Sequence, residues 1–286
     1  MTVSLPTAHA QAGPDSTGAS TLELGHPGAR FLVAAYQVAA RTMKKFVRTP
    51  SLIVAGAAQG ALFLLIFRYV FGGAIGHLGS LSYVDFLVPG FVVTGLLFTG
   101  IGSSTGIADD IQAGLFDRLR SLPIRLLSIV SGRVAADSCL MVYGMVVTIL
   151  IGVLVGFRTV NGAGDAAVAF ALTVLYGFSF LWMFVSLGLL AGGPQAAQGI
   201  SFLVFPLSFV SSAYIPVSTM PGWMQAFAAH QPMTYMVDTV RILCEGQGAS
   251  SPLGHPLGSS LLPSVVWAVG LIAVFAPVTV ATLHRA

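Results

Sequence analysis

Long apolar runs separated by short polar stretches dominate the chain, and this pattern predicts helices that cross a membrane. A helix of about 20 mostly apolar residues spans the hydrocarbon core of a bilayer. Six runs reach that length, and they occupy residues 51–71, 84–106, 134–157, 166–191, 199–217 and 262–283. The runs are continuous rather than alternating in polarity, which favours helices over the strands of a β-barrel. The sequence therefore predicts an all-α polytopic membrane protein with six transmembrane helices.

The segment before the first run, residues 30–49, has apolar and polar positions at helical spacing. Apart from Arg30 at its start, its basic residues are Arg41, Lys44, Lys45 and Arg48. A basic amphipathic helix of this kind suits the headgroup layer, so we expect an N-terminal interfacial helix. The same charges also serve as a topology signal, and that simpler interpretation stays open.

The connection between the fifth and sixth runs, residues 218–261, is long and too polar to span a membrane. Its apolar residues suggest two short amphipathic helices, and Pro232 separates them because proline interrupts helical hydrogen bonding. Trp223 and Tyr235 are typical of residues at the membrane interface. We therefore expect re-entrant external helices here.

Composition agrees with a membrane protein. Only 8% of the residues are charged and 55% are hydrophobic, whereas soluble domains are about 25% charged. Residues 1–29 contain no apolar run and no Lys or Arg, and they predict a disordered tail. Residues 50–286 are expected to form one six-helix membrane domain.

The distribution of Lys and Arg predicts the orientation. Most of them lie before the first run, between the second and third, and after the sixth, while the opposite loops contain only Arg68, Arg158 and Arg241. Positive loops stay inside, so both termini are expected in the cytoplasm. Because the basic residues flank apolar runs, they do not indicate nucleic-acid binding.

Motifs for chemistry within this chain are weak. No G-x-x-x-x-G-K-[ST] sequence is present, so the chain has no Walker A site of its own for ATP. The GSSTG sequence at 102–106 matches a hydrolase pattern, but it lies in an apolar helical run and is typical of close helix packing. Cys139 and Cys244 lie in different segments and suggest neither a disulfide framework nor a metal site. No catalytic or metal-binding residue is predicted.

A charged segment separates the second and third runs. Projected as a helix, its apolar side carries Leu115, Phe116, Leu119 and Leu122. Its polar side carries Asp117, Arg118 and Arg120, and it is followed by Pro123 and Arg125. The pattern alone fits two arrangements equally well, a helix lying on lipid and a helix docked on a soluble partner.

Around this segment the chain resembles a known family. The sequence DDIQAGLFDRLRSLPIRLLSIVSGRVAAD is similar to the cytoplasmic segment after the second span of type-2 ABC exporter permeases, in particular the daunorubicin-resistance type of bacterial drug and lipid exporters. The shared pattern comprises Asp109–Gly114, Phe116–Pro123 and Gly132–Arg133. HQPMTYMVDTVR, from His230 to Arg241, is similar to the family's N-Q-P-like external segment, with His230 in place of Asn. The resemblance covers nearly the whole chain after residue 30.

This resemblance implies a permease subunit in the bacterial cytoplasmic membrane. Two permeases, identical copies or sister chains, pair and recruit ABC ATP-binding subunits, which bind the ATP and Mg²⁺ that this chain does not. A cytoplasmic coupling helix at the charged segment then transmits motion from the ATP-binding subunits to the spans. In this arrangement Arg118, Arg120 and Arg125 contact the ATPase, and the apolar residues of the segment anchor the helix to the bundle. A drug-like or lipid-like amphiphile leaves between the permeases.

Two other classes remain as alternatives, a non-transporting membrane scaffold or assembly protein and a membrane-embedded enzyme. The scarcity of polar residues in the middle of the runs disfavours the enzyme. Several aromatic residues either line an apolar path or pack helices and face lipid. They are Phe91, Phe98, Phe178, Phe202, Phe205 and Phe209.

Overall fold

The computed structural model describes residues 27–49, 60, 62–72, 77–78, 81–116, 126–246 and 257–285. Helices dominate this part of the chain, and two two-residue strands form a small antiparallel hairpin. The elements are α1 (Pro27–Arg48), η1 (Phe67–Phe71), β1 (His77–Leu78), β2 (Leu81–Ser82), α4 (Tyr83–Gln112), α6 (Leu126–Val155), α7 (Ala163–Leu190), α8 (Pro194–Phe202), α9 (Phe205–Phe209), η2 (Val217–Thr219), α10 (Gly222–His230), α11 (Pro232–Glu245) and α12 (Leu257–Arg285).

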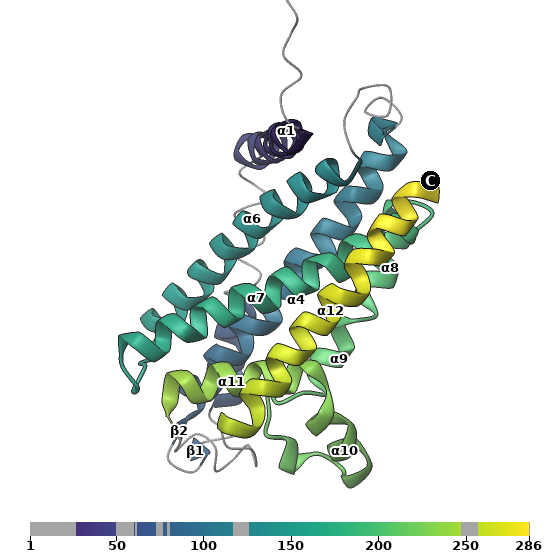
Figure 1. Cartoon of the computed structure of the whole chain (residues 1–286). Helices are drawn as coiled ribbons and strands as arrows, with labels where there is room; N and C mark the ends of the chain where they lie inside the picture. The colour runs from purple at the N-terminus through teal and green to yellow at the C-terminus, as the bar shows by residue number, and fades with distance from the viewer. Residues whose placement is uncertain are drawn as a thin grey trace, which may run out of the picture.

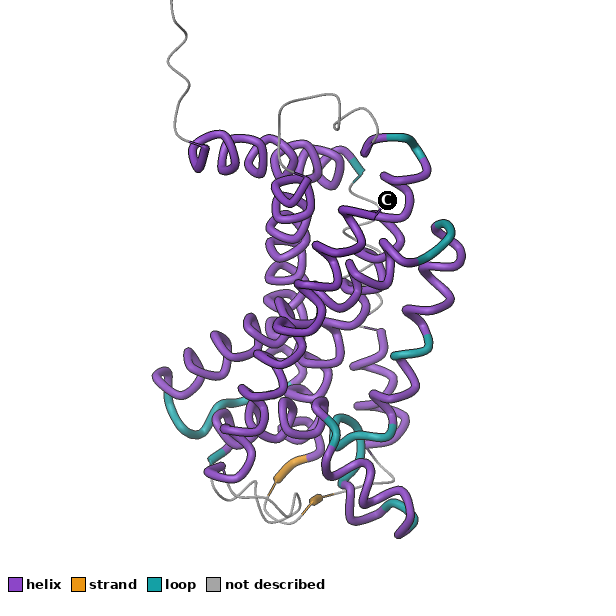
Figure 2. Tube along the Cα trace, turned by 45° about the vertical axis from the view of Figure 1, so that its right-hand side comes forward, coloured by secondary structure: helices purple, strands orange, loops and turns teal. Residues whose placement is uncertain are grey.

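Four of the described helices are long and apolar enough to cross a membrane, namely α4, α6, α7 and α12. They run side by side as a bundle, and the end of α12 lies at the same end of the bundle as α1 (Figure 1). Helix α1 lies across this end rather than along the bundle (Figure 2). We call it the α1 end and the opposite one the α10 end. The four helices confirm four of the six predicted runs.

Helix α4 occupies the centre of the bundle and is largely buried. It begins at an N-cap, because the Ser82 hydroxyl accepts a hydrogen bond from the Asp85 amide at 3.2 Å. Its small residues admit α7 closely, since a side chain at Gly188 of α7 would meet the Ser104 carbonyl oxygen at 2.3 Å. The GSSTG sequence thus lies in a packed helix, as predicted.

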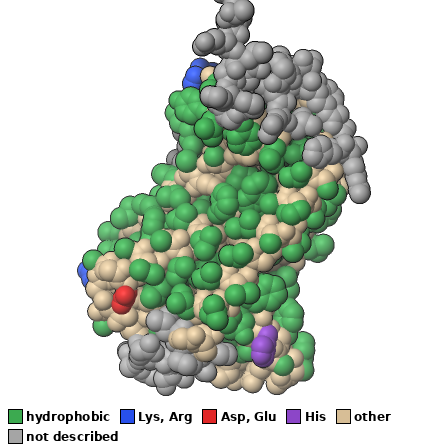
Figure 3. Space-filling view, viewed as in Figure 1, with side chains coloured by type: hydrophobic (Ala, Val, Ile, Leu, Met, Phe, Trp, Pro, Cys, Tyr) green, Lys and Arg blue, Asp and Glu red, His purple; other side chains and the backbone are tan. Residues whose placement is uncertain are grey.

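Hydroxyl groups connect the peripheral helix α12 to α7. Tyr176 and Ser264 share a hydrogen bond of 2.7 Å between their oxygens. Nearer the α1 end, Ser186 and Thr279 share another of 2.7 Å. Few residues in the most apolar parts of α12 and α6 are fully buried. The face drawn in Figure 3 is predominantly hydrophobic with charges only near its two ends. Such a surface suits a lipid environment.

The fifth apolar run differs from its prediction. One helix was expected over 199–217, but α8 ends at Phe202, α9 covers only Phe205–Phe209, and the chain is not regularly helical from there to Pro216. Pro206 explains the interruption, because its nitrogen has no hydrogen to donate to the Phe202 carbonyl. The two short helices nevertheless follow one another along the bundle toward the α10 end (Figure 1).

Other boundaries also moved. Helix α4 continues to Gln112 and α6 begins at Leu126, so Arg133 lies two turns inside α6 rather than at its start. Two short helices, α10 and α11, follow the fifth run, and Pro232 is the first residue of α11, as the proline predicted. Of the first run, 51–71, only residues 60 and 62–71 are described, and they are helical, with η1 in the wider π form.

Candidate functional site

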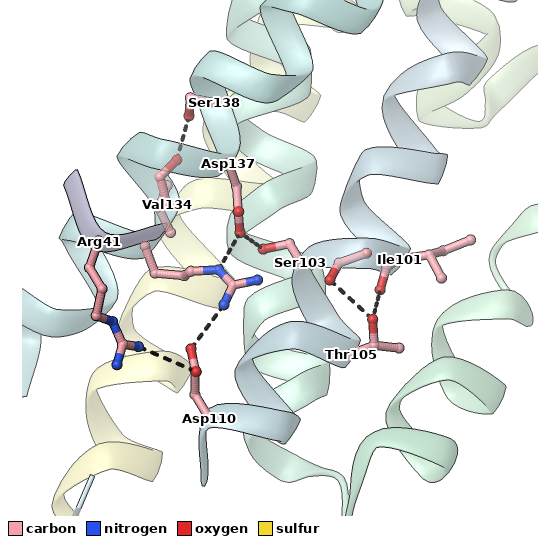
Figure 4. A network of polar contacts seen from close by, with 10 residues as sticks. Arg41, Ile101, Ser103, Thr105, Asp110, Val134, Asp137 and Ser138 are labelled. Carbon is pink, nitrogen blue, oxygen red and sulfur yellow. Dashed lines mark hydrogen bonds and ion pairs between the residues drawn. The ribbon is translucent and has the colours of Figure 1, made fainter. Parts of the chain in front are cut away.

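A network of charged side chains joins three helices at the α1 end (Figure 4). Arg133 of α6 donates from Nε to Asp137 and from a terminal nitrogen to Asp110 of α4, both at 2.9 Å. Asp137 also accepts a hydrogen bond from the Ser103 hydroxyl. Asp110 in turn binds Arg41 of α1 at 3.4 Å. We call these five residues the Arg133 network.

Local sequence spacing explains most of this geometry. Arg133 and Asp137 are four residues apart and therefore adjacent on α6, which is the pairing that the spacing predicted. Ser103 and Asp110 are two helical turns apart and share one face of α4. Gly106 lies between them, and a Cβ atom there would approach an Arg133 nitrogen to 2.0 Å. The glycine thus leaves room for the guanidinium group.

Exposure increases along the network from the bundle to α1. The side chain of Asp137 is 2% exposed, those of Arg133 and Asp110 are 9% and 20% exposed, and that of Arg41 is 53% exposed. Buried charges need partners, and here each buried charge has an opposite one within hydrogen-bonding distance. The network therefore holds α6 firmly against α4. It adds one exposed ion pair to the close packing of α1 on α6, where a Cβ atom at Gly132 would meet the Ala35 carbonyl oxygen at 2.3 Å.

A cavity of about 780 Å³ lies beside the network, between α1, α4, α6 and α8. Its charged lining residues are Arg41, Lys45, Asp109, Asp110, Arg133 and Asp137. Its lining on α4 continues to Val92, which is about 27 Å from Asp110 at 1.5 Å per residue. Phe98 of α4 and Phe202 of α8 also line it. The cavity is thus charged at the α1 end and apolar further in.

Aromatic rings continue from the cavity toward the α10 end. Phe98 packs on Phe205 of α9 with ring centres 5.0 Å apart, Phe205 packs on Phe209 at 5.3 Å, and Phe209 packs on Tyr214 at 4.9 Å. Phe91 meets Tyr214 at 5.1 Å. We call this series the aromatic column. Five of the six phenylalanines singled out from the sequence belong to it or touch it, whereas Phe178 packs on Trp182 of α7.

A second buried arginine lies toward the α10 end. Arg241 of α11 is completely buried and donates to the carbonyl oxygens of Phe86 and Ser212, both at 2.9 Å. It also binds Asp238 at 3.3 Å, and its guanidinium lies 3.8 Å from the centre of the Phe86 ring. We call Arg241, Asp238, Ser212 and Phe86 the Arg241 network.

The location of Arg241 corrects its interpretation as a loop charge on one membrane face. Burial lowers the pKa of Arg241 to about 10, and the Asp238 carboxylate opposes that shift, so the guanidinium stays charged near neutral pH. Its partner Phe86 lies in the first turn of α4, three residues before Pro89. The Asp238–Arg241 spacing within an apolar helix was the signal that sequence reasoning missed.

The structure tests few of the residues predicted to couple to an ATPase. Leu115 is half-buried and Phe116 is buried in the hydrophobic core. Asp117, Arg118, Leu119, Arg120, Leu122, Pro123 and Arg125 lie outside the described residues. Of the predicted interfacial residues, Arg41 joins the Arg133 network, Lys45 lines the cavity, and Lys44 and Arg48 are exposed. Among the described residues, no group of three or more His, Cys, Asp or Glu is placed to hold a metal ion.

Comparisons with known proteins give a consistent result. A family model described as ABC-2 type transporter matches residues 34–244, which include both arginine networks. The chain is 33% identical to the daunorubicin resistance ABC transporter permease protein DrrB1 of Streptomyces coeruleorubidus, over 84% of this chain and 82% of that protein. It is 24% identical to the probable doxorubicin resistance permease DrrC of Mycobacterium tuberculosis, over 82% and 83%. The putative transport permease ycf38 of Cyanophora paradoxa is 25% identical, over 74% of each chain.

Proposed function

The chain belongs to the ABC-2 type transporter family, and from this premise we propose that it is the permease subunit of an ATP-driven exporter. The match of the family model to residues 34–244 carries the proposal. A separate ABC ATP-binding subunit supplies the energy, since the sequence has no Walker A motif. The cargo is a drug-like or lipid-like amphiphile, moved out of the cytoplasm or the inner leaflet, and the drug-resistance names of two relatives support this class.

In this proposal the chain crosses a bacterial cytoplasmic membrane six times. The four long helices supply four crossings, the first apolar run supplies another, and the broken α8–α9 segment supplies the last. The α1 end faces the cytoplasm, with α1 in the headgroup layer and both termini on that side. The orientation of α1 across the bundle (Figure 2) and its basic residues support this placement.

The Arg133 network is the element through which the ATPase acts on the bundle. The charged segment between α4 and α6 docks on the ATPase, with Arg118, Arg120 and Arg125 as its contacts, and it is covalently continuous with both helices of the network. Arg41 brings α1 to the same point. A displacement of either docking element therefore changes the pairing of α4 with α6, which is a small packing change that a bundle can amplify.

The cavity and the aromatic column mark the path of the cargo. An amphiphile enters the cavity from the α1 end, where the charges lie, and moves along the aromatic rings toward Tyr214. A second permease, an identical copy or a sister chain, closes the other side of the path. Aromatic faces suit this role because they attract apolar groups of many shapes without specific hydrogen bonds.

Reconstitution tests the proposal. The tagged chain, expressed with a candidate ATP-binding subunit, is expected to co-purify with it and to support ATP-dependent uptake of a fluorescent amphiphile into inside-out vesicles. A partner in which the Walker A lysine is replaced by Met provides the matched control. Uptake that persists with this control, or a chain that recruits no ATPase, contradicts the proposal and favours a scaffold.

A charge reversal tests the docking role of the charged segment. Asp117→Arg combined with Arg120→Asp is expected to leave ATP hydrolysis in place while transport per ATP falls. Both charges are reversed because a single surface ion pair contributes less than about 1 kcal/mol. Unchanged transport at equal expression contradicts the role.

A further inference from the structure

We propose that the cavity beside the Arg133 network binds one zwitterionic amphiphile per chain, with a positive and a negative group in its head and an apolar tail. This inference rests on the proposed function, because it names the class of cargo that enters the path. It derives from which charges in the cavity lining already have partners and which do not.

Most charges in the described lining neutralise one another. Arg133 is bonded to Asp110 and Asp137, and Arg41 is bonded to Asp110. These two arginines and two aspartates sum to zero charge. Because the pairs are partly buried, separating them to bind a ligand is costly. The network therefore shapes the cavity but does not supply free charge to a head group.

Two lining residues remain available, one of each sign. Lys45 of α1 and Asp109 of α4 both line the cavity and are exposed. Neither forms an ion pair with another described residue. An ammonium offers three donors that suit a phosphate or carboxylate, and a carboxylate accepts hydrogen bonds from an amine. A head group that carries both signs satisfies both residues, whereas a singly charged head leaves one of them unpaired.

The rest of the cavity fits an acyl chain or another apolar body. Along α4 the lining changes from Asp109 to Val92, and Phe98 and Phe202 also line the cavity. A Cβ atom added at Gly102 or Gly95, which also line it, would meet no atom within 4 Å. This open space beside the glycines is apolar, so transferring a hydrocarbon tail into it is favourable.

Lipid binding to the purified full-length chain tests the proposal by native mass spectrometry. The probes share their acyl chains and differ in head group, namely phosphatidylethanolamine, the anionic phosphatidylglycerol and a cationic trimethylammonium lipid. We expect phosphatidylethanolamine to bind about fivefold more tightly than either of the others, the effect of one partly exposed ion pair. Glycerophosphoethanolamine, which has the same head without chains, is expected not to compete, which separates a lipid from a free soluble zwitterion.

Two charge-removing variants give opposite expected shifts. Asp109→Asn removes the partner of the ammonium and shifts the preference toward phosphatidylglycerol, while Lys45→Gln shifts it toward the cationic lipid. Lys44→Gln, the neighbouring exposed lysine outside the cavity lining, is the matched control and is expected to change nothing. Equal binding of the three lipids, or shifts in the same direction for both variants, overturns the proposal.

Gly102→Leu locates the binding. A leucine there fills the cavity, so binding of all three lipids is expected to weaken without a change in head-group preference. If Gly102→Leu lowers the thermal stability of the chain, Gly95→Leu is used as the test variant in its place. Unchanged binding in the folded variant places the lipids elsewhere and overturns the site. These measurements need no ATPase, so they are independent of the transport assay. If the chain shows no head-group preference but supports ATP-driven transport, this inference alone is rejected. If it shows the preference but supports no ATP-driven transport, the proposed function alone is rejected.

Discussion

The two buried arginines of this molecule are held in different ways. Arg241 is bonded to three backbone carbonyl oxygens and to an aspartate of its own helix, and none of its side chain is exposed. Arg133 is bonded only to carboxylates, and its network extends to Arg41, whose side chain is half exposed. Backbone acceptors have fixed positions, whereas carboxylates rotate and exchange partners. The comparison indicates a rigid α10 end and an α1 end that can be rearranged.

This difference suits the two ends to different tasks. Arg241 joins α11 to the first turn of α4 and to the turn at Ser212. It replaces hydrogen bonds that membrane helices cannot obtain from lipid. The Arg133 network joins three helices through charges that a docking partner can disturb. Motion that begins at the α1 end can therefore change helix pairing there while the opposite end keeps its packing.

The largest expected effect comes from Arg241→Met. The methionine removes the positive charge and leaves Asp238 and three carbonyl oxygens buried beside an apolar side chain. Breaking one partner of a buried ion pair costs about 3–5 kcal/mol. We expect a strong loss of folded protein, measured as the thermal unfolding midpoint and the monodisperse fraction in detergent. Arg158→Gln, at an exposed arginine between α6 and α7, is the control, and equal stability of the two variants contradicts a rigid α10 end.

A pair of glycine substitutions compares the two ends directly. A Cβ atom at Gly90 of α4 would meet the Ala213 backbone oxygen at 2.0 Å, whereas one at Gly106 would meet the end of the Arg133 side chain at 2.0 Å. Backbone in a packed turn cannot move away cheaply, so Gly90→Ala is expected to destabilise by about 1–3 kcal/mol. The end of the Arg133 side chain can shift further than backbone can, although its ion pairs resist this, and alanine favours the helix. Gly106→Ala is therefore expected to cost less than Gly90→Ala. Denaturation of both variants in the same detergent measures the difference, and equal costs reject the contrast between backbone and side-chain neighbours.

The apolar pattern was sufficient to predict the long helices, because burying about 20 apolar residues in lipid leaves the helix as the available structure. The break in the fifth run was not predicted, although Pro206 is present in the sequence. The prediction rested on the average apolar character of the run, which does not show the helical hydrogen bond that a proline removes. The pairing of α11 with the α4 turn also could not be predicted. It depends on contacts between residues separated by more than 150 positions.

The candidate site was predictable only in its local part. The Arg133–Asp137 spacing predicted an ion pair within one helix, and the structure contains it. Asp110 and Arg41 come from other helices, so no local pattern assigned them to the same network. Arg241 was counted as a loop charge because it lies between two apolar runs, and the sequence does not show that its side chain is buried. Charges within a short helix therefore need tertiary contacts before they are assigned to a membrane face.

A smaller effect is expected at Glu245, at the end of α11. Burial, together with the nearby Asp85 carboxylate and against the opposing charge of Arg241, raises the pKa of Glu245 from 4.5 to about 8. One of its carboxyl oxygens has no hydrogen-bond partner. The folded chain therefore holds this proton above pH 4.5 where the unfolded chain has lost it, so the stability of the folded state falls as the pH rises from about 4.5 toward 8. Glu245→Gln is expected to flatten this slope by up to about 1 kcal/mol per pH unit.

Thermal unfolding in detergent at several pH values measures this slope. Asp165→Asn, the same acid-to-amide change at a half-buried residue in the first turn of α7, is the matched control and is expected to leave the slope as it is. A slope that is identical in the wild type and Glu245→Gln shows that the carboxyl is ionised throughout this range. That result contradicts a tightly packed α10 end, because water would then reach the buried carboxylate.

The smallest effect on stability is expected at Arg41, the exposed member of the Arg133 network. Arg41→Glu replaces an attraction to Asp110 by a repulsion at the α1 end, where the charges are exposed and screened, so the cost is below about 1 kcal/mol. The attachment of α1 is nevertheless expected to weaken, because no other ion pair between described residues joins α1 to the bundle. Faster hydrogen exchange in residues 31–48 and lower transport per ATP hydrolysed measure this. Lys44→Glu, on the same helix but outside the network, controls for the change in charge. If Arg41→Glu is stable and its hydrogen exchange in α1 and its transport match those of Lys44→Glu, the ion pair does not transmit motion. The two ends of the bundle then differ only in how deeply their arginines are buried.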